Sequence, residues 1–478
     1  MNPVFARLAR RFVRWRLGQL SPEQLLRLSE RKVLRAFQRA SKQSPAYRIL
    51  LAESGTDPAQ VRTVTEFVAA CPILDKSNTF RRFPLNELIS QDVPARSIAS
   101  ILTSSGHGGG GFALGLSTRA QMSAAPWDID IGLDIAFDID RQRTLLINCL
   151  PMGVTFQSDT VCVANVSVRE DMACAIVEQT GHLFEQIVLC GDPLFLKRLC
   201  DFSEARGLDW GCHRMHAIVG EETFSEFFRD YLAETLHVNP DRPESGLIGS
   251  SMGVGELGLN LFYETRETVA LRRACARDRS KLTELLGHQF DPDSALAPLP
   301  TFLAFNPLRT FVEINAPDED GCGDLLVSML GPTVAIPLMR YKTGDRATRI
   351  DPARLAAMAG IGKPGPFPVI ALQGRAKDVI APGWHVDTFK DALYRRRDIA
   401  RHLTGAFRLS RLDGGLQWEL QLVRGCEADP GEIALALKDC LSGRQGGEKL
   451  AINCYPYALF PYGQTLDHER KFVYWVAD

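Results

Sequence analysis

Short apolar runs alternate with amphipathic segments between about residues 95 and 260, and this alternation constrains the fold more than any other feature of the chain. The runs RTLLINCLP, FEQIVLCG, MHAIVG and SGLIGSS are typical of buried strands. The segments PLFLKRLCDFSEARGL and ETFSEFFRDYLAETLHV lie between them and predict helices. Strands that alternate with helices predict an α/β fold with a largely parallel sheet that is covered on both faces.

The pattern changes twice in the second half of the chain. The runs RTFVEIN and GDLLVSMLG predict a β-rich subdomain that leads to PLMRYKTGD. Further on, FRLSRL and LQWELQLVR predict a hairpin, and GEIALALKDCLSG predicts a helix. We therefore expect an N-terminal domain over residues 1–373 and a small, mobile α+β domain over residues 374–478, with the linker near LQGRAKD.

The first 20 residues contain five arginines and no acidic residue. We expect a surface helix that starts the fold, but the pattern also fits a basic amphipathic anchor or a transit peptide. A longer helical pattern follows, with Ser21 and Pro22 well placed as N-cap and first-turn residue. No run approaches the roughly 18 apolar residues that a bilayer-spanning helix needs, so no integral membrane segment is expected.

Charge and cysteine usage exclude several functional classes. The formal net charge is -2, which argues against a nucleic acid as partner. The chain has 12 cysteines, and no two of them form a CxxC pair. Together with the absence of any histidine spacing typical of metal sites, this argues against zinc. Cysteines inside apolar runs indicate reduced, buried thiols and a cytoplasmic protein.

A glycine-rich loop, SSGHGGGGFALGLS at residues 104–117, predicts a phosphate-binding segment. The hydroxyls of Ser104 and Ser105 and the backbone of Gly106 and Gly108 would face the phosphate. The loop lacks the lysine that usually accompanies such glycines. A protonated His107 would supply part of that missing positive charge.

Four further motifs occur in a fixed order: VGEE at 219–222, SMGVGELG at 251–258, PLMRYKTGD at 337–345 and GRAKD at 374–378. Each alone is typical of an ordinary turn or cap. As an ordered set with the glycine loop, they resemble the adenylate-forming (ANL) superfamily, most closely its phenylacetate–CoA ligase-like branch. The resemblance spans the chain from about residue 25 to its end.

The resemblance implies an ATP-dependent ligase that activates a carboxylic acid, aromatic or medium-chain, as an acyl-adenylate. The acyl group would then pass to the thiol of coenzyme A or of a carrier-protein phosphopantetheine, with Mg²⁺ as cofactor. A second possibility is a non-catalytic or repurposed relative that binds an acyl group, an adenylate or a carrier protein without turnover. A third retains adenylation but transfers the acyl group to an amine or to a protein residue. A homodimer is plausible from the resemblance alone.

The resemblance also assigns roles to individual residues. Glu256 would help to place Mg²⁺, and Asp345 would accept hydrogen bonds from the ribose hydroxyls. Arg375 would lie beside the nucleotide, Lys377 would be the hinge between the domains, and Lys471 would be the adenylation lysine.

The nucleotide site would also include the turn of Gly220, Glu221 and Glu222, and Gly253. Met252 stands where the family usually has an aromatic residue, and Gly255 stands where it usually has Ser or Thr. These departures favour the non-catalytic alternative. The acid pocket is expected to be apolar. Its predicted lining is Pro151, Met152, Val154, Phe156, Ser251 and Met252.

Overall fold

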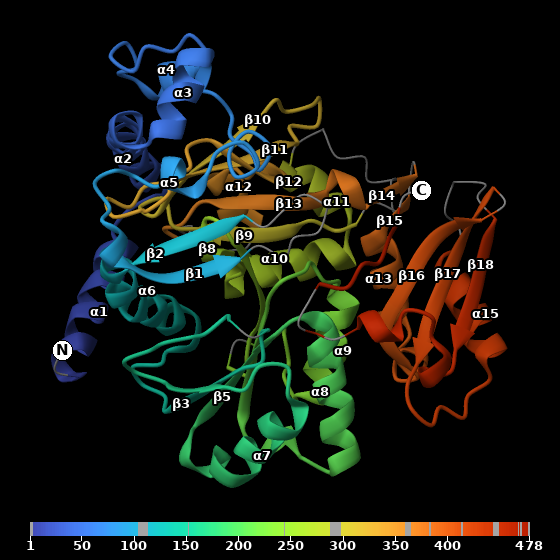
Figure 1. Cartoon of the computed structure of the whole chain (residues 1–478). Coiled ribbons are helices and arrows are strands. Elements are labelled where there is room, and N and C mark those ends of the chain that lie inside the picture. Colours follow the sequence, from blue (N-terminus) through green and yellow to red (C-terminus); the bar gives the residue numbers. More distant parts are fainter. Residues whose placement is uncertain are drawn as a thin grey trace.

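The computed structural model describes residues 3–103, 113–151, 153–242, 244–286, 298–358, 365–381, 384–412, 414–442, 449–466, 468 and 471–476. Its centre is a sheet of 11 strands in the order β4-β3-β5-β6-β7-β8-β9-β13-β12-β11-β10 (Figure 1). The expected α/β class is thus confirmed.

The predicted parallel strands form one half of this sheet. Leu145 and Ile147 pack into one apolar cluster with helices α7, α8 and α9, whereas Leu146 between them packs into another with helix α6. Both faces are therefore covered, as the apolar runs predicted. The elements of this half are α6 (Arg119–Phe137), β3 (Thr144–Asn148), β4 (Cys162–Asn165), α7 (Glu170–Thr180), β5 (Gln186–Gly191), α8 (Pro193–Arg206), β6 (Arg214–Val219), α9 (Glu226–Thr235) and β7 (Ile248–Val254).

The helix predicted from Glu222 onward begins later than expected. Helix α9 starts at Glu226, because the side chain of Ser225 accepts a hydrogen bond from the backbone N–H of Phe228 and acts as the N-cap. Residues 222–224 instead continue the turn that follows β6.

Strand β7 pairs in parallel with β6 on one side and antiparallel with β8 on the other, so the sheet changes character there. The remaining pairs are all antiparallel and confirm the predicted β-rich section. This half comprises β8 (Gly258–Tyr263), α10 (Arg266–Arg277), α11 (Ser280–Leu286), β9 (Thr301–Phe305), β10 (Thr310–Asn315), β11 (Gly323–Met329), β12 (Tyr341–Arg349), α12 (Pro352–Met358) and β13 (Val369–Arg375).

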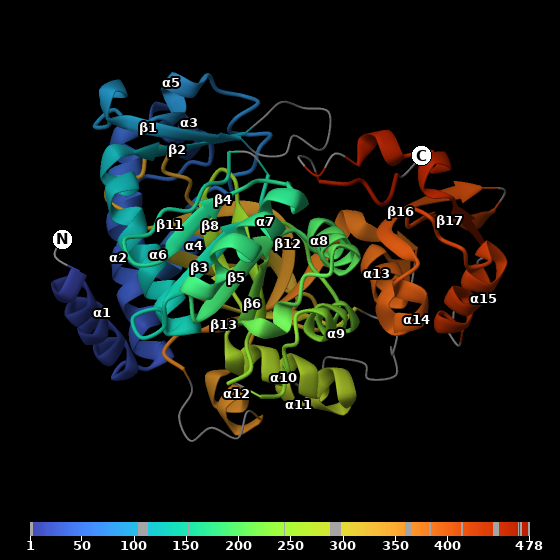
Figure 2. The ribbon, with the colours of Figure 1, turned by 90° about the horizontal axis from the view of Figure 1, so that it is seen from below.

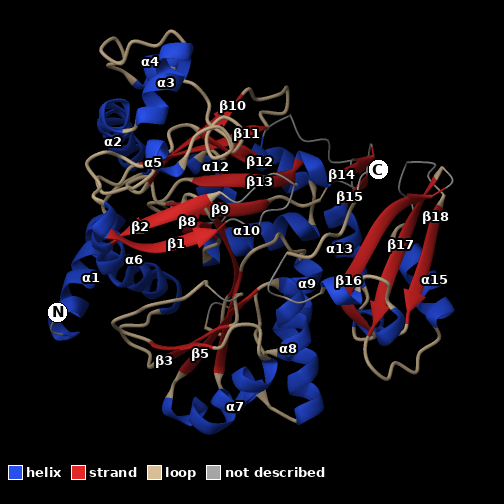
Figure 3. Ribbon diagram, in the orientation of Figure 1, coloured by secondary structure: helices blue, strands red, loops and turns tan. Residues whose placement is uncertain are grey.

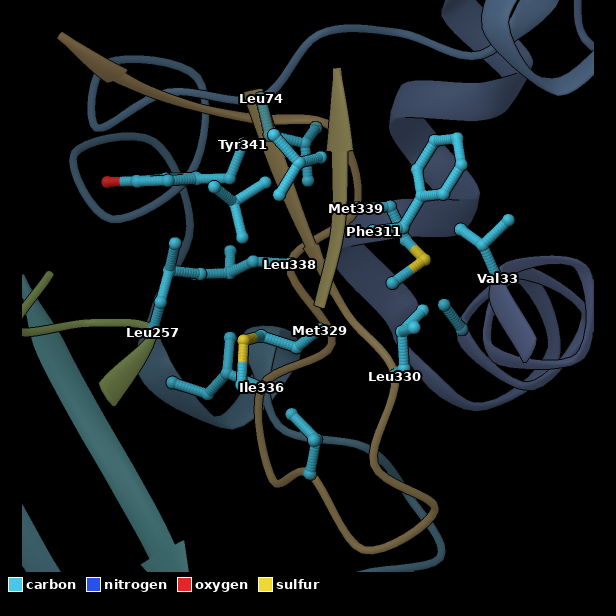
Figure 4. Packing of buried hydrophobic residues seen from close by; sticks show 14 of the residues in the cluster. Val33, Leu74, Leu257, Phe311, Met329, Leu330, Ile336, Leu338, Met339 and Tyr341 are labelled. Carbon is cyan, nitrogen blue, oxygen red and sulfur yellow. The ribbon is translucent and has the colours of Figure 1, made fainter. Parts of the chain in front are cut away.

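Helices α2 to α5 pack against the antiparallel half, whereas α1 packs against α6. Ser21 caps α2 as predicted, in a capping box with Gln24. Figure 4 shows Val33 of α2 in the same buried cluster as Phe311 and Leu330. The N-terminal elements are α1 (Pro3–Gly18), α2 (Pro22–Gln43), α3 (Pro45–Glu53), α4 (Val64–Ala70), α5 (Leu85–Leu88), β1 (Ile98–Thr103) and β2 (Leu114–Thr118).

The C-terminal residues form a separate three-stranded sheet with its own core, which is centred on Phe389, Phe407 and Trp418. Its predicted hairpin is confirmed, because β16 and β17 are antiparallel. In Figures 1 and 3 this unit lies beside α8 and α9. Its elements are β14 (Val379–Ala381), β15 (Trp384–His385), α13 (Val386–Arg395), α14 (Arg397–Ala400), β16 (Leu403–Leu412), β17 (Gly415–Leu422), α15 (Pro430–Cys440) and β18 (Leu450–Tyr455). The domain boundary at residues 373/374 falls within β13 and stays a prediction.

Candidate active site

Asp345 and Arg375 face each other across neighbouring strands β12 and β13. Arg375 donates from Nε to Asp345 Oδ1 at 2.9 Å, and the charge of Asp345 raises the pKa of Arg375. Asp345 is 4% exposed, and no described residue donates to its buried Oδ2. A buried carboxylate oxygen without a donor is costly, so this atom is suited to accept a hydrogen bond from a ligand.

Glu256 lies in the tight turn between β7 and β8, as its motif predicted. Tyr341 donates its hydroxyl to Glu256 Oε1 at 2.6 Å, and Lys76 Nζ lies 3.3 Å from the same oxygen. Burial and the charge of Glu256 raise the pKa of Tyr341, so the phenol keeps the proton that it donates. No described residue donates a hydrogen bond to Glu256 Oε2, which leaves one carboxylate oxygen for a further partner.

A strained turn follows β6 at the carboxyl ends of the parallel strands. Glu221 has a φ of 68°, and the Glu222 N–H donates to the Gly220 carbonyl at 2.8 Å. A non-glycine residue in this conformation is uncommon and is held only when its surroundings require it. A Cβ at Gly220 would lie 3.4 Å from Leu150 Cδ2 and 3.9 Å from the Ser251 carbonyl. The predicted segments around Leu150, Gly220 and Ser251 therefore meet at this turn. Open α/β sheets bind ligands at this end of their parallel strands.

Two lysines of the C-terminal unit reach this turn. Lys471 Nζ donates to the Glu221 carbonyl at 2.8 Å and lies 3.1 Å from Glu221 Oε2. Lys390 Nζ lies 2.7 Å from Glu222 Oε2. Burial opposes the charge on Lys390, but the carboxylates of Glu222 and Asp387 prevail and raise its pKa. Thr223 donates its hydroxyl to Asp387 at 3.1 Å, so three contacts join the turn to the C-terminal unit.

The side chains of Arg375, Lys377 and Lys471 lie close enough to interact electrostatically. Partial burial and the charges of Arg375 and Lys471 lower the pKa of Lys377, although its side chain reaches solvent. The predicted hinge, nucleotide and adenylation residues are thus electrostatic neighbours. Arg375 and Lys471 are each paired with a carboxylate here, so a phosphate would have to exchange with Asp345 or Glu221 to bind them directly.

A buried acid lies close to the strained turn. Asp192 caps α8 by accepting a hydrogen bond from the Phe195 N–H. Burial raises the pKa of Asp192 to about 7, and the carboxylates of Glu222 and Glu221 add to the effect. Its Oδ2 has no hydrogen-bond partner among the described residues.

The residues predicted to line the acid pocket are only partly brought together. Met252 packs against the cluster of the N-terminal helices, whereas Phe156 packs against the cluster beneath α6. Pro151 and Val154 are half-buried, and Ser251 donates its hydroxyl to Asn260 at 3.0 Å. Gly253 is exposed in β7. Ser104, Ser105, Gly106, His107, Gly108 and Met152 lie outside the described residues.

Sequence reasoning missed three residues that the structure brings to the site. Tyr341 stands inside PLMRYKTGD but was given no role, although a buried tyrosine there needs a partner. Lys76 and Lys390 belong to no quoted motif, and they meet Glu256 and Glu222 from distant parts of the sequence. No local signal identifies such long-range contacts.

The described residues hold no group of three or more His, Cys, Asp or Glu side chains that could bind a metal ion. A site with a single carboxylate still accords with Mg²⁺, which proteins bind through one or two carboxylates and the phosphates of a substrate. Nor is any helix in the described ranges long and apolar enough to cross a bilayer.

Comparison with known proteins identifies the fold. No protein-family model matches the sequence, and no curated protein matches it. Among solved structures, 2-hydroxyisobutyryl-CoA ligase in the postadenylation state with R3-HIB-AMP matches with a TM-score of 0.65, at 13% identity, over 96% of this chain and 89% of that one. The same ligase in an open conformation with 2-HIB-AMP and CoA gives a TM-score of 0.55, at 14% identity, over 96% and 91% of the two chains.

In its thioesterification state, that ligase gives a TM-score of 0.54, at 14% identity, over 92% of this chain and 87% of the other. The chain has the fold of the adenylate-forming ligases, as the order of its motifs predicted. The phenylacetate–CoA ligase-like branch stays a prediction.

Proposed function

We propose that this chain is an AMP-forming acid–thiol ligase in the cytoplasm. It joins a carboxylic acid, aromatic or medium-chain, to coenzyme A or to the phosphopantetheine of a carrier protein. The observation that carries this proposal is Asp345, whose one oxygen is held by Arg375 while the other is buried without a donor. Ribose hydroxyls are suitable donors for such an oxygen.

The surrounding charges support a nucleotide in this position. Arg375 would lie beside the ribose and the α-phosphate, because it is fixed on the Asp345 carboxylate. Lys377 and Lys471 would face the phosphates, since both are electrostatic neighbours of this site. Glu256 would hold Mg²⁺ through the oxygen that Tyr341 leaves free. When bound, Mg²⁺ neutralises charge on the phosphate oxygens.

The first reaction step needs positioning and charge stabilisation rather than a protein nucleophile. A carboxylate oxygen of the acid attacks the α-phosphorus of ATP, and the bond to the β-phosphate oxygen breaks. Pyrophosphate leaves with its electron pair and an acyl-adenylate remains. Lys471 and Arg375 would stabilise the negative charge that accumulates on the phosphate oxygens in this step.

In the second step, a thiolate attacks the acyl carbon and AMP leaves. The contacts of Lys471 and Lys390 with the turn at 221–222 would have to break to admit the thiol. We propose Lys377 as the hinge for this motion, with residues 374–478 as the moving domain and residues 1–373 as the fixed one.

A second candidate function is a non-catalytic or repurposed protein that binds an acyl group, an adenylate or a carrier protein. One observation favours it: Lys76 lies 3.3 Å from Glu256 Oε1, so a cation already neutralises the proposed metal ligand. The exchanges at Met252 and Gly255 point in the same direction. Adenylation with an amine or a protein residue as the acceptor stays a prediction, and the identity of the acceptor distinguishes it from the first function. A homodimer stays a prediction.

The decisive measurement is pyrophosphate release with ATP, Mg²⁺ and a library of aryl and alkyl acids, with and without coenzyme A. We expect release with at least one acid, and a loss of about 100-fold in Asp345→Ala, because that change removes a charged hydrogen-bond acceptor. Asp171→Ala is the matched control, since Asp171 forms an exposed pair with Arg169. No release from folded protein that still binds a nucleotide would favour the non-catalytic function.

A further inference from the structure

Helix α1 presents its apolar side chains to solvent. Val4 and Phe5 are each 67% exposed, and Leu8, Phe12 and Trp15 are 57%, 59% and 57% exposed. At the angular spacing of an α-helix, these five side chains occupy an arc of about 100° on one face. This inverts the usual arrangement, in which the apolar face of a surface helix packs against the core.

The opposite face of α1 is fixed to the fold by buried charges. Arg10 is 1% exposed and donates from Nε to Asp140 at 3.2 Å. Arg14 Nη1 lies 2.6 Å from the buried carboxylate of Asp134 on α6 and 3.0 Å from Asp138. Removing one partner of such a buried pair is costly, so the pairs hold the helix in one orientation. The outward direction of the apolar face is therefore built into the fold.

Exposed arginines border the apolar face. Arg7 and Arg11 flank one edge and Arg16 flanks the other, at the angular spacing of a helix. All three are exposed, and none of them forms an ion pair with a described residue. The sequence has no acidic residue before Glu23, so the outer surface of α1 is apolar and cationic. Arg7 and Arg11 share a cavity with Asp134, Asp138 and Asp140, and these three aspartates are already paired with Arg10 and Arg14.

We propose that α1 binds to the surface of an anionic phospholipid bilayer, with Phe12 and Trp15 among the acyl chains and the arginines among the headgroups. An exposed apolar face with cationic edges is the pattern of helices that lie in a membrane interface. A second copy of the chain is a poorer occupant, because two α1 helices would bring uncompensated arginines together. Figures 1 and 2 place α1 at the edge of the molecule, away from the C-terminal unit, so docking leaves that unit free.

Binding of the full chain to vesicles tests this proposal. Vesicles of equal parts phosphatidylcholine and phosphatidylglycerol are compared with vesicles of phosphatidylcholine alone, by flotation and by tryptophan emission. We expect binding to the anionic vesicles only, with a blue shift of the emission from Trp15. Trp210, Trp384 and Trp418 are buried and contribute little to that shift. Trp127 and Trp475 are half-buried, so flotation supplies the binding readout that does not depend on tryptophan.

Two sets of variants separate the apolar and the charged contributions. Phe12→Glu should reduce the vesicle affinity by more than about 10-fold, because it places a charge among acyl chains. Replacing Arg7, Arg11 and Arg16 together by alanine should reduce it by about 100-fold, since each basic residue near an anionic surface contributes about fivefold. The matched control is Leu435→Glu, which changes a 62% exposed leucine on α15 and should leave the affinity unchanged.

Trp15→Gln repeats the test in case Phe12→Glu fails to fold, and circular dichroism reports the folding of every variant. Equal binding to both kinds of vesicle, or unchanged binding of the folded Phe12 and Trp15 variants, would overturn the proposal. Self-association that Phe12→Glu abolishes, without any vesicle binding by the parent chain, would identify a second copy as the occupant instead. None of these readouts depends on ligase activity.

Discussion

At the scale of single residues, the site contains acidic groups whose charge the fold only partly balances. Asp345 and Glu256 each have one oxygen held by a neighbouring side chain and one without a hydrogen-bond donor among the described residues. Asp192 is buried more completely, and no described lysine, arginine or histidine forms an ion pair with it. Partly satisfied groups of this kind are typical of binding sites rather than of stable cores.

The burial of Asp192 predicts how the free energy of unfolding changes with pH. Burial raises its pKa to about 7 in the folded protein, against 3.8 for an ordinary aspartate. The folded state therefore keeps a proton that the unfolded chain loses above about pH 4. The contribution of Asp192 to stability is complete below pH 4 and is lost as the pH rises through 7. Between pH 5 and pH 8 the loss amounts to about 3 kcal/mol.

The variant Asp192→Asn keeps an oxygen that can cap α8 but does not titrate. Urea unfolding of both proteins at pH 5 and pH 8 should show the variant gaining about 3 kcal/mol relative to the parent between the two values. Because both proteins share all other titrating groups, the difference isolates Asp192. An equal stability difference at both pH values would mean that Asp192 is ionised in the folded protein.

At the scale of elements, the sequence predicted what depends on local patterns. Strands β3 and β5 were predicted as apolar runs, because every residue in them is buried in the parallel part of the sheet, and most of β6 is buried in the same way. The start of α9 was wrong, since Ser225 competes as a cap with the helical pattern before it. The single sheet that joins the parallel and antiparallel halves was not predictable, because β7 carries no local sign that it pairs in both ways.

The candidate site likewise contains residues that local motifs predicted and residues that only the folded structure brings in. Asp345, Arg375 and Glu256 were proposed because each belongs to a short motif with its own turn or strand end, and their roles stay predictions. The partners Tyr341 and Lys76 lie far from Glu256 in the sequence and meet it only in the folded sheet. The acid pocket was harder still, since side chains as separate as Phe156 and Met252 pack into different clusters.

Close packing of two glycines supports the Glu256 turn and gives a prediction at this scale. A Cβ at Gly115 of β2 would lie 2.2 Å from the Gly255 carbonyl, and backbone atoms cannot yield cheaply. Gly115→Ala should destabilise the protein by about 1–3 kcal/mol and slow adenylation, because the turn that holds Glu256 must shift. Gly132→Ala is the matched control, since Gly132 lies within α6 and has open space around its Cα.

Alanine at position 132 should stabilise the protein by about 0.5–1 kcal/mol, because alanine is more favourable than glycine inside a helix by that amount. Calorimetric melting temperatures and pyrophosphate release, measured on both variants, check the pair of predictions. A Gly115→Ala variant as stable and as active as the parent would show that β2 and the Glu256 turn are not held in contact.

At the scale of the whole molecule, the proposed chemistry depends on where the C-terminal unit docks on the rest of the chain. The three contacts at residues 221–223 are made by Lys471, Lys390 and Asp387. They join segments separated by more than 160 positions, so they form only when the C-terminal unit is docked. An arrangement that places Lys471 at the nucleotide site should serve adenylation and leave the thiol step to another arrangement.

Lys471→Ala tests this division of labour. We expect acid-dependent ATP–pyrophosphate exchange to slow by about 100-fold or more, because a cation that stabilises transferring phosphate is lost. Transfer of the acyl group from added acyl-adenylate to the thiol should keep its rate, since Lys471 would have left the site by then. Lys438→Ala is the matched control, an exposed lysine on α15 of the same unit. Equal slowing of both steps would indicate that Lys471 acts by docking the unit, and an unchanged exchange rate would assign adenylation to another lysine.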